Sequence, residues 1–393
     1  MAKTIYNKKI KNGKEYYFYR LRHPNLKAPR DLYATSVKEL EKKIKSLNYE
    51  LDNGILSTKV TFENFFCNWL FDVHLINKKP STCEKYEGLY RNYVKGSSIS
   101  DINIKNITLN DIQSYYNDLY KNNTTVSTIK NLNKLVAPCI RYAYDNNLII
   151  KDFSKALILP KEKEEEKLIK KDSVNPFSLS EQLKFIEVIS GHELETLFIT
   201  ALDSGLRQGE LLALTWDDID FLNECIIVNK TVKLISEVSK NGREKGEYLL
   251  QTPKSIKANR TVTIPTVLVK RLKQYRIEQL QNKLKISNLY NDNNLVFCNQ
   301  YGKYLDSSKV RKELKKILKN NKMSDRKFHD LRHTYATRLF ELGEDPKTVQ
   351  ELLGHSNISI TLDTYTHVLE NMKKKAASKL NDLYSNVYYK GQN

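Results

Sequence analysis

Four short segments of this 393-residue sequence carry side chains that could bind an anion and attack it. Two of them contain an arginine. Gly205-Leu-Arg-Gln-Gly-Glu-Leu211 places Arg207 between glycines at the start of a predicted helix, and His329-Asp-Leu-Arg332 sets a histidine three residues before an arginine. An i, i+3 pair lies on one face of a helix, so both side chains can address the same group. A planar guanidinium offers two parallel N–H donors to phosphate oxygens, a geometry that lysine lacks.

The other two segments add a lysine, a histidine and a tyrosine. Lys254 lies in a predicted turn between two strands, and Leu353-Gly-His355 is followed ten residues later by Tyr365. A phenol with a pKa of about 10 is neutral at pH 7, so it needs a proton acceptor to act as a nucleophile. Singly, each segment fits ordinary structure: a surface arginine, a solvated hairpin lysine or a helix face. Their joint occurrence in this order does not.

Together the four segments resemble the tyrosine recombinase (phage integrase) family. Its pattern is an arginine, a hairpin lysine, His-x-x-Arg, Leu-Gly-His and then a nucleophilic tyrosine. Residue by residue, the resemblance assigns six catalytic positions: Arg207, Lys254, His329, Arg332, His355 and Tyr365. Residues 329–368 are especially similar to integrases of Gram-positive phages and conjugative transposons. The resemblance is strong from about residue 177 onward, and the earlier part matches by layout only.

The resemblance implies a site-specific DNA recombinase that cleaves and rejoins strands through a 3′-phosphotyrosine, integrating and excising a mobile element or prophage. The arginines and His355 would stabilise the charged phosphorus centre. His329 is the family's candidate acceptor for the phenolic proton, and Lys254 the candidate acid for the leaving 5′ oxygen. The covalent bond keeps the energy of the phosphodiester, so no ATP, metal or other cofactor is expected.

The expected partners are double-stranded DNA with core and arm attachment sites, three further copies of the chain in a tetramer, and an excision factor. Two other functions fit part of the pattern: a recombinase-derived DNA-binding protein that no longer cuts, and a relaxing topoisomerase. The complete set of six residues argues against the first. The second leaves the basic N-terminal residues without a role.

Composition agrees with a nucleic-acid partner. Lys and Arg number 65 against 46 Asp and Glu, a formal charge of +19. Such an excess indicates a polyanion, of which an acidic membrane surface is the rarer kind, although a lysine-rich composition alone gives the same sign. Without an apolar run of membrane length or an apolar leader, we expect a cytoplasmic, nucleoid-associated protein without a membrane partner. Five scattered cysteines without a C-x-x-C pair argue against a disulfide framework and a zinc site.

Periodicity and turn residues divide the chain into three predicted domains. Residues 1–58 form a small β-sheet plus helix, an arm-type DNA-binding domain whose hairpin turns at Asn12-Gly13. Strand alternation places Tyr16 and Phe18 on the same face as Arg20 and Arg22, the two candidate DNA-binding arginines. If that face is not a DNA surface, its basic residues merely solvate the sheet.

The remaining two domains are predicted to be an all-α core-binding (SAM-like) domain at 61–159 and an α+β catalytic domain at 177–393. The catalytic domain is expected to be mostly helical with a small antiparallel sheet. The charged segment 160–176 reads as a flexible linker. In the helix that carries His329, the predicted buried stripe is Leu331, Tyr335, Leu339 and Leu342. After Tyr365, apolar residues at helical spacing through Leu380 predict a helix that docks on a neighbouring subunit or packs on its own domain.

Overall fold

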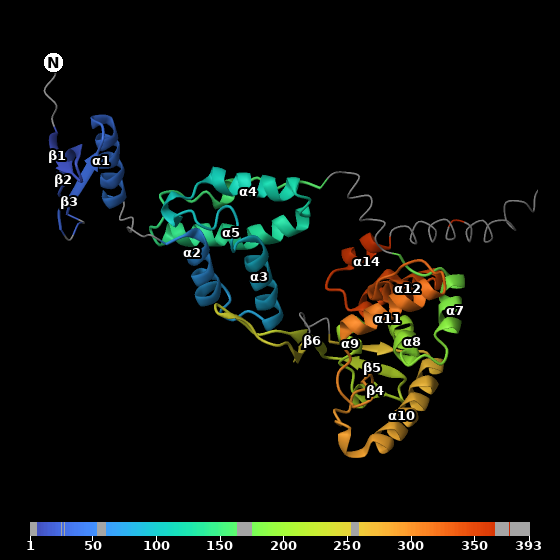
Figure 1. Cartoon of the computed structure of the whole chain (residues 1–393). Coiled ribbons are helices and arrows are strands. Elements are labelled where there is room, and N and C mark those ends of the chain that lie inside the picture. Colours follow the sequence, from blue (N-terminus) through green and yellow to red (C-terminus); the bar gives the residue numbers. More distant parts are fainter. Residues whose placement is uncertain are drawn as a thin grey trace, which may run out of the picture. The chain divides into compact units, whose positions relative to one another are not determined.

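The computed structural model describes residues 6–24, 26, 28–52, 60–162, 175–252, 259–365 and 377. The chain divides into two compact units (Figure 1). The first comprises Met1–Glu162 together with Ser236–Lys245, and the second comprises Lys163–Ile235 with Gly246–Asn393. Most of the predicted linker, residues 163–174, lies outside the described residues.

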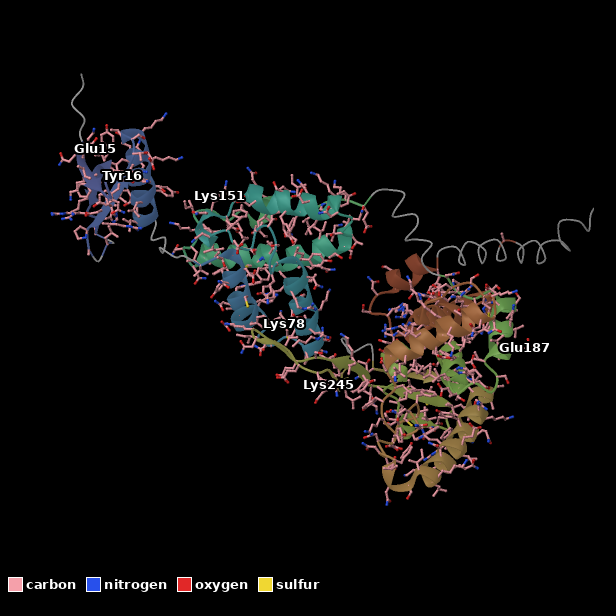
Figure 2. All side chains as sticks on the ribbon, viewed as in Figure 1. Glu15, Tyr16, Lys78, Lys151, Glu187 and Lys245 are labelled. Atoms are coloured by element: carbon pink, nitrogen blue, oxygen red, sulfur yellow. The ribbon has the colours of Figure 1, made fainter. Side chains whose placement is uncertain are left out.

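The first unit begins with an antiparallel sheet of order β1-β2-β3 and one helix. The strands are β1 (Asn7–Lys11), β2 (Lys14–Leu21) and β3 (Arg30–Ala34), and the helix is α1 (Val37–Asp52). Asn12 and Gly13 take positive φ values of 51° and 71°, as a tight hairpin turn requires. Leu21 and Ala34 of the sheet and Leu40 and Leu47 of the helix are buried. Figure 2 shows the side chains of the sheet, with Glu15 and Tyr16 of β2 labelled. The predicted sheet-plus-helix architecture is confirmed.

Helices make up the rest of residues 60–162. They are α2 (Phe62–Trp69), a π-helical turn η1 (Leu70–His74), α3 (Pro80–Tyr93), η2 (Ile104–Asn106), α4 (Leu109–Lys121), α5 (Val126–Asp145) and η3 (Ser154–Ala156). Thr61 caps α2, and Thr108 forms a capping box with Asp111 at the start of α4. The aromatic side chains at helical spacing fill the core, among them Phe62, Phe66 and Tyr116.

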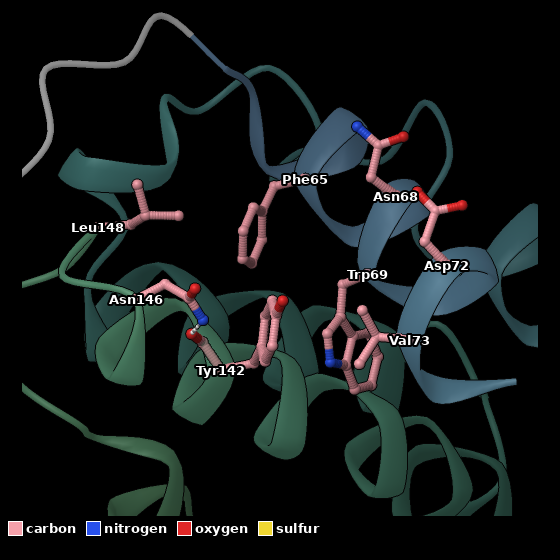
Figure 3. A pocket seen from close by; sticks show the side chains of 8 residues that line it. All are labelled: Phe65, Asn68, Trp69, Asp72, Val73, Tyr142, Asn146 and Leu148. Carbon is pink, nitrogen blue, oxygen red and sulfur yellow. Dashed lines mark hydrogen bonds between the residues drawn. The ribbon is translucent and has the colours of Figure 1, made fainter. Parts of the chain in front are cut away.

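A pocket of about 340 Å³ opens beside α2 and α5 (Figure 3). Aromatic rings of Phe65, Trp69 and Tyr142 line it, with Asn68 and Asp72 at one side. Asp72 forms an ion pair with Lys240, whose ammonium also donates to Asn68 Oδ1 at 2.9 Å. Because its one lining carboxylate already has a cationic partner, the pocket offers packing surface rather than a reactive group.

Lys240 belongs to a short hairpin, β7 (Val238–Ser239) and β8 (Gly242–Arg243), which packs with the first unit although the sequence places it among later strands. Arg243 of the hairpin forms an ion pair with Glu84 of α3. The predicted catalytic domain at 177–393 includes these ten residues, whereas in the structure they belong to the first unit. Their grouping depends on side-chain pairs more than 150 positions apart in the sequence, which local patterns do not reveal.

The second unit is mostly helical around small antiparallel sheets, as predicted. Its strands are β4 (Ile219–Asp220), β5 (Cys225–Val228) and β10 (Arg260–Thr263) in the order β10-β5-β4, and a separate pair, β6 (Thr231–Ile235) with β9 (Glu247–Gln251). Its helices are α7 (Leu179–Val188), α8 (Glu195–Ser204), α9 (Gln208–Leu211), η4 (Trp216–Asp218), α10 (Thr266–Ile286), η6 (Ser287–Leu289), α11 (Ser307–Asn320), α12 (Phe328–Leu342), α13 (Pro346–Leu353) and α14 (Ile358–Thr364).

Residues 225–232 carry two strands of this unit rather than one, because the chain leaves β5 at Val228 and enters a different sheet as β6 at Thr231. Helix α12 packs against α8, and α13 packs against both α12 and β10. This packing brings together residues from four distant parts of the sequence. Of the helices described, none is both long and apolar enough to span a membrane.

Candidate active site

The C-terminal end of α13 is the centre of the site. The last carbonyls of a helix have no partner within the helix and carry a partial negative charge. Three arginines donate to three successive carbonyls there: Arg260 Nε to Leu352 O at 2.8 Å, Arg332 Nη2 to Leu353 O at 2.6 Å and Arg207 Nη2 to Gly354 O at 3.4 Å. His355 follows directly. The three guanidinium groups therefore converge on backbone carbonyls at and beside the Leu-Gly-His segment.

Arg332 joins the ends of two helices. Its Nη1 donates to Gly205 O at 2.7 Å, at the end of α8, while Nη2 reaches α13. The side chain is buried. Burial, followed by the charge of Arg207, lowers the pKa of Arg332 to about 9, so the group remains charged at neutral pH. Two of its five N–H donors are used, which leaves three for a bound anion.

A buried carboxylate holds the other two arginines. Glu210 Oε1 accepts from Arg207 Nη1 at 2.8 Å, and Glu210 Oε2 accepts from Arg260 Nη2 at 2.9 Å and from the Arg207 backbone N–H at 2.9 Å. Burial would raise the pKa of Glu210, but the hydrogen bonds and charges of Arg260 and Arg207 hold it at about 2. One carboxylate thus balances two guanidinium groups, and the charge of Arg332 adds to the excess.

Tyr365 and three histidines lie in the same cluster. The Tyr365 hydroxyl is 2.8 Å from His333 Nδ1, and the His333 ring meets His329 edge to face with centroids 4.7 Å apart. His355 Nδ1 is 2.8 Å from Thr361 Oγ1 in α14. Burial, followed by nearby positive charges that include Arg332, lowers the pKa of His329 to about 4 and the pKa values of His333 and His355 to about 3. All three rings are therefore neutral at pH 7.

Comparison with known proteins decides the family. The Phage integrase family model matches residues 161–372, more than half of the chain, and the model of its N-terminal SAM-like domain matches residues 61–120. The chain belongs to the phage integrase family. A tyrosine recombinase XerC-like protein of Caldanaerobacter subterraneus subsp. tengcongensis is 40% identical over 386 residues, covering 95% of this chain and 98% of that protein.

Two further proteins that are similar to this chain are integrases of mobile elements. The integrase of Staphylococcus phage L54a is 24% identical over 363 residues, 88% of this chain and 99% of that protein. A structure of the Tn1549 transposon integrase in complex with transposon right end DNA has the same fold, with 20% identity, a TM-score of 0.61, and 81% of this chain and all of that chain covered. The resemblance to phage and transposon integrases of Gram-positive bacteria is confirmed.

The structure of this integrase-family chain brings five of the six predicted catalytic residues into one unit. Arg207, Arg332 and His355 meet at the end of α13, and His329 and Tyr365 lie beside them. Their roles remain predictions. Lys254 falls at 253–258, outside the described residues. Sequence reasoning missed Glu210, Arg260 and His333, although each stands within six positions of a predicted residue.

The two predicted DNA-binding arginines lie on the N-terminal sheet. Arg20 is tied to Asp31 on the neighbouring strand, with Nε–Oδ1 at 2.7 Å and Nη2–Oδ2 at 3.1 Å, while Arg22 is exposed just beyond β2. Lys9 lies over the Phe18 ring at 4.0 Å. Arg20 would have to exchange or share Asp31 in order to bind a phosphate, so Arg22 is the freer cation of the two.

Glu210→Gln tests the buried charge network. We expect a loss of about 3–5 kcal/mol in the free energy of unfolding, because the change removes the carboxylate that pairs with the buried guanidinium of Arg260. Denaturant unfolding would measure it. Glu351→Gln is the control: its partner Lys347 lies 3.3 Å away in an exposed pair, for which about 0–1 kcal/mol is expected. Equal losses in the two variants would contradict the network.

Gly354→Ala tests the close approach at the end of α13. Gly354 has φ of 66°, and a Cβ there would stand 2.9 Å from Arg260 Cδ and 3.1 Å from Arg260 Nη1. Gly343, at the end of α12, has φ of 96° but open space around the same position. Both alanine variants should lose the roughly 1–2 kcal/mol that left-handed backbone costs, measured by thermal unfolding. Only Gly354→Ala should also impair DNA cleavage, and an equal impairment in Gly343→Ala would refute the contact's importance.

Proposed function

We propose that this family member is an integrase that cleaves and rejoins DNA through a 3′-phosphotyrosine at Tyr365, integrating and excising a mobile element or prophage. The observation that carries the proposal is the convergence of Arg207, Arg332 and His355 on the end of α13, with the Tyr365 hydroxyl in the same cluster. Among the described residues, the cluster holds more buried cations than carboxylates, which favours an anionic ligand such as a phosphodiester.

Arg207 and Arg332 would hold the non-bridging oxygens of the scissile phosphate and stabilise the charge that grows on them. Both guanidinium groups are anchored to carbonyls of α13, so they need little reorganisation when DNA binds. If the Thr361 hydroxyl donates to Nδ1 of His355, the Nε2 of that ring carries a hydrogen and becomes a third donor. These groups position and polarise the phosphate.

Tyr365 would attack the phosphorus, and Lys254 would protonate the departing 5′ oxygen. A protonated leaving group matters because an alkoxide leaves slowly. The resulting 3′-phosphotyrosine keeps the energy of the diester, so a 5′ hydroxyl from a second duplex can reverse the step without ATP. His329 remains the family's candidate for accepting the phenolic proton.

The division of labour along the chain follows the predicted domains. Residues 61–159 and 177–393 would each bind the core site, while the basic N-terminal sheet would bind arm sites on double-stranded DNA. Because strand exchange needs two duplexes cut at two positions each, the active form would be a tetramer on the chromosome in the bacterial cytoplasm. Excision would add an excision factor. The Tn1549 integrase in complex with transposon right end DNA and the phage integrase support DNA as the partner.

Removing residues 1–58 tests that division. We expect the truncated protein to cleave a core site at a rate within about threefold of the full chain, while integration falls by tenfold or more. The reason is that arm contacts contribute binding through linked sites rather than chemistry. Cleavage and integration would be measured on the same substrates. Loss of all core binding in the truncated protein would contradict the assignment.

A suicide substrate tests the proposed function. It is a duplex carrying one end of the element, nicked close to the cleavage position so that the short product diffuses away and the protein remains attached. A band of protein joined to DNA on a denaturing gel is the expected result. Binding without any such band would instead favour a recombinase-derived DNA-binding protein that no longer cuts.

A further inference from the structure

We propose that His333, rather than His329, accepts the phenolic proton as Tyr365 attacks the phosphate; this assignment rests on the proposed function. The Tyr365 hydroxyl lies 2.8 Å from His333 Nδ1, a direct hydrogen bond between the reacting oxygen and an imidazole nitrogen. A general base must lie within hydrogen-bond reach of the proton that it removes. His333 meets that requirement before DNA is bound.

Both partners of this hydrogen bond are held in place. Tyr365 is 1% exposed and packs against Phe340, with ring centroids 5.4 Å apart, in a small core that includes Leu353 and Val349. The His333 ring is flanked edge-on by His329. A donor and an acceptor that are already aligned need no reorganisation at the moment of transfer. His329 then acts as the ring that orients His333.

The protonation states suit a base that is idle until DNA arrives. Burial raises the pKa of Tyr365, and burial together with the charges of His329, Arg332 and His355 lowers the pKa of His333 to about 3. When the proton of the neutral His333 ring lies on Nε2, the phenol donates and Nδ1 accepts. The charge of Arg332 lowers the pKa of Tyr365 and the charge of Asp330 raises it, so burial decides the direction. A phosphodiester bound to Arg332 and Arg207 would offset the positive field at His333 and increase its basicity.

The step balances without a redox partner. The Tyr365 O–H bond breaks and its proton passes to His333 Nδ1, while the phenolic oxygen forms a bond to phosphorus. The bond from phosphorus to the 5′ oxygen breaks, and that oxygen takes a proton from the acid, Lys254 in the proposed function. In rejoining, the 5′ hydroxyl attacks the phosphorus and gives its proton back to the neutral amine of Lys254, while the imidazolium returns its proton to the phenolic oxygen as the bond from that oxygen to phosphorus breaks.

The test compares His333→Ala and His333→Asn with the full-length wild type in single-turnover cleavage of the suicide substrate at saturating DNA. The amide oxygen of asparagine reaches about the position of Nδ1 and preserves the hydrogen bond, but it does not take up a proton near neutral pH. We expect both variants to lose about 10²- to 10⁴-fold in adduct formation with DNA binding unchanged. Their rates should climb with pH between 7 and 9 more steeply than that of the wild type, because hydroxide replaces the missing base.

Three outcomes would overturn the proposal. Cleavage by His333→Asn close to the wild-type rate would show that His333 only holds the tyrosine. A cleavage rate in His333→Ala equal to or above that of wild type would show that His333 restrains Tyr365 in the free protein. pH profiles parallel to that of wild type would show that His333 does not act as a base. Thermal unfolding checks that the variants fold, and His192→Ala, in the turn before α8, is the matched histidine control. A wild type that forms no adduct contradicts the proposed function itself, whereas wild-type adduct with normal His333 variants contradicts only this inference.

Discussion

Tyr365→Phe is expected to eliminate the covalent protein–DNA adduct, a loss of at least about 10⁴-fold, the order seen when a covalent nucleophile is removed. The change deletes one oxygen and leaves the ring in its packed position against Phe340. Binding of a core-site duplex should therefore be unchanged. Gel shift and denaturing gel on the same reactions measure the two quantities separately.

The control for this variant is a tyrosine of similar burial elsewhere. Tyr116, in the core of the helical domain, is fully buried, and its hydroxyl donates to Asn133 Oδ1 at 3.1 Å. Tyr116→Phe should lose about 0.5–1.5 kcal/mol of stability, the usual net value of one hydrogen bond, and keep cleavage. Adduct formation by Tyr365→Phe at a tenth of the wild-type rate or more would move the nucleophile to another residue.

Arg332→Ala should reduce cleavage by about 10²- to 10³-fold, the usual loss when one charge-stabilising donor is removed. It should also lower stability by about 1–3 kcal/mol, because the carbonyls of Gly205 and Leu353 lose their buried partner. Arg332→Lys should behave similarly in cleavage, since one ammonium does not span two helix ends and a phosphate at once. Single-turnover cleavage and denaturant unfolding give the two effects.

Arg338→Ala on the same helix separates the two effects. Arg338 also donates to a backbone carbonyl, Phe177 O at 2.8 Å, but pairs with Glu341 rather than with the site. It should lose stability with cleavage within about threefold of wild type, the scale of surface and packing contacts remote from the chemistry. If Arg332→Ala loses no more cleavage activity than Arg338→Ala, Arg332 has only a structural role and does not hold the scissile phosphate.

Local sequence patterns predicted the elements that carry the site better than the contacts within it. Helices begin directly after Thr61, Thr108 and Ser178, residue types that favour a helix start and can be recognised in a sequence, because a cap depends on neighbours within four positions. The predicted stripe of α12 is correct for Leu331 and Tyr335 but wrong for Leu342, which is 80% exposed. Leu342 is the last residue of the helix, and Gly343 turns the chain away there.

The contacts among the site residues depend on long-range geometry. Arg260 reaches Leu352 across 92 positions and Arg207 reaches Gly354 across 147, and no local period relates such pairs. The family pattern predicted the six catalytic positions but not the neighbouring residues that hold their side chains in place. His333 was overlooked because the i, i+3 rule drew attention to His329, whereas the hydrogen bond to Tyr365 comes from the residue directly after Arg332. Glu210 lies three positions after Arg207 at a helix start, where an acidic residue is favoured, so its pairing with Arg207 could have been predicted from the sequence.

The role of Tyr365 as the nucleophile is tested by mapping the protein–DNA bond in the adduct from a suicide substrate. Proteolysis and mass spectrometry of the adduct should place the DNA on the peptide that contains Tyr365, as a phosphotyrosine joined to a 3′ end, with a free 5′ hydroxyl on the other strand end. A bond to a different residue, or to a 5′ phosphate, would contradict the mechanism proposed for this site.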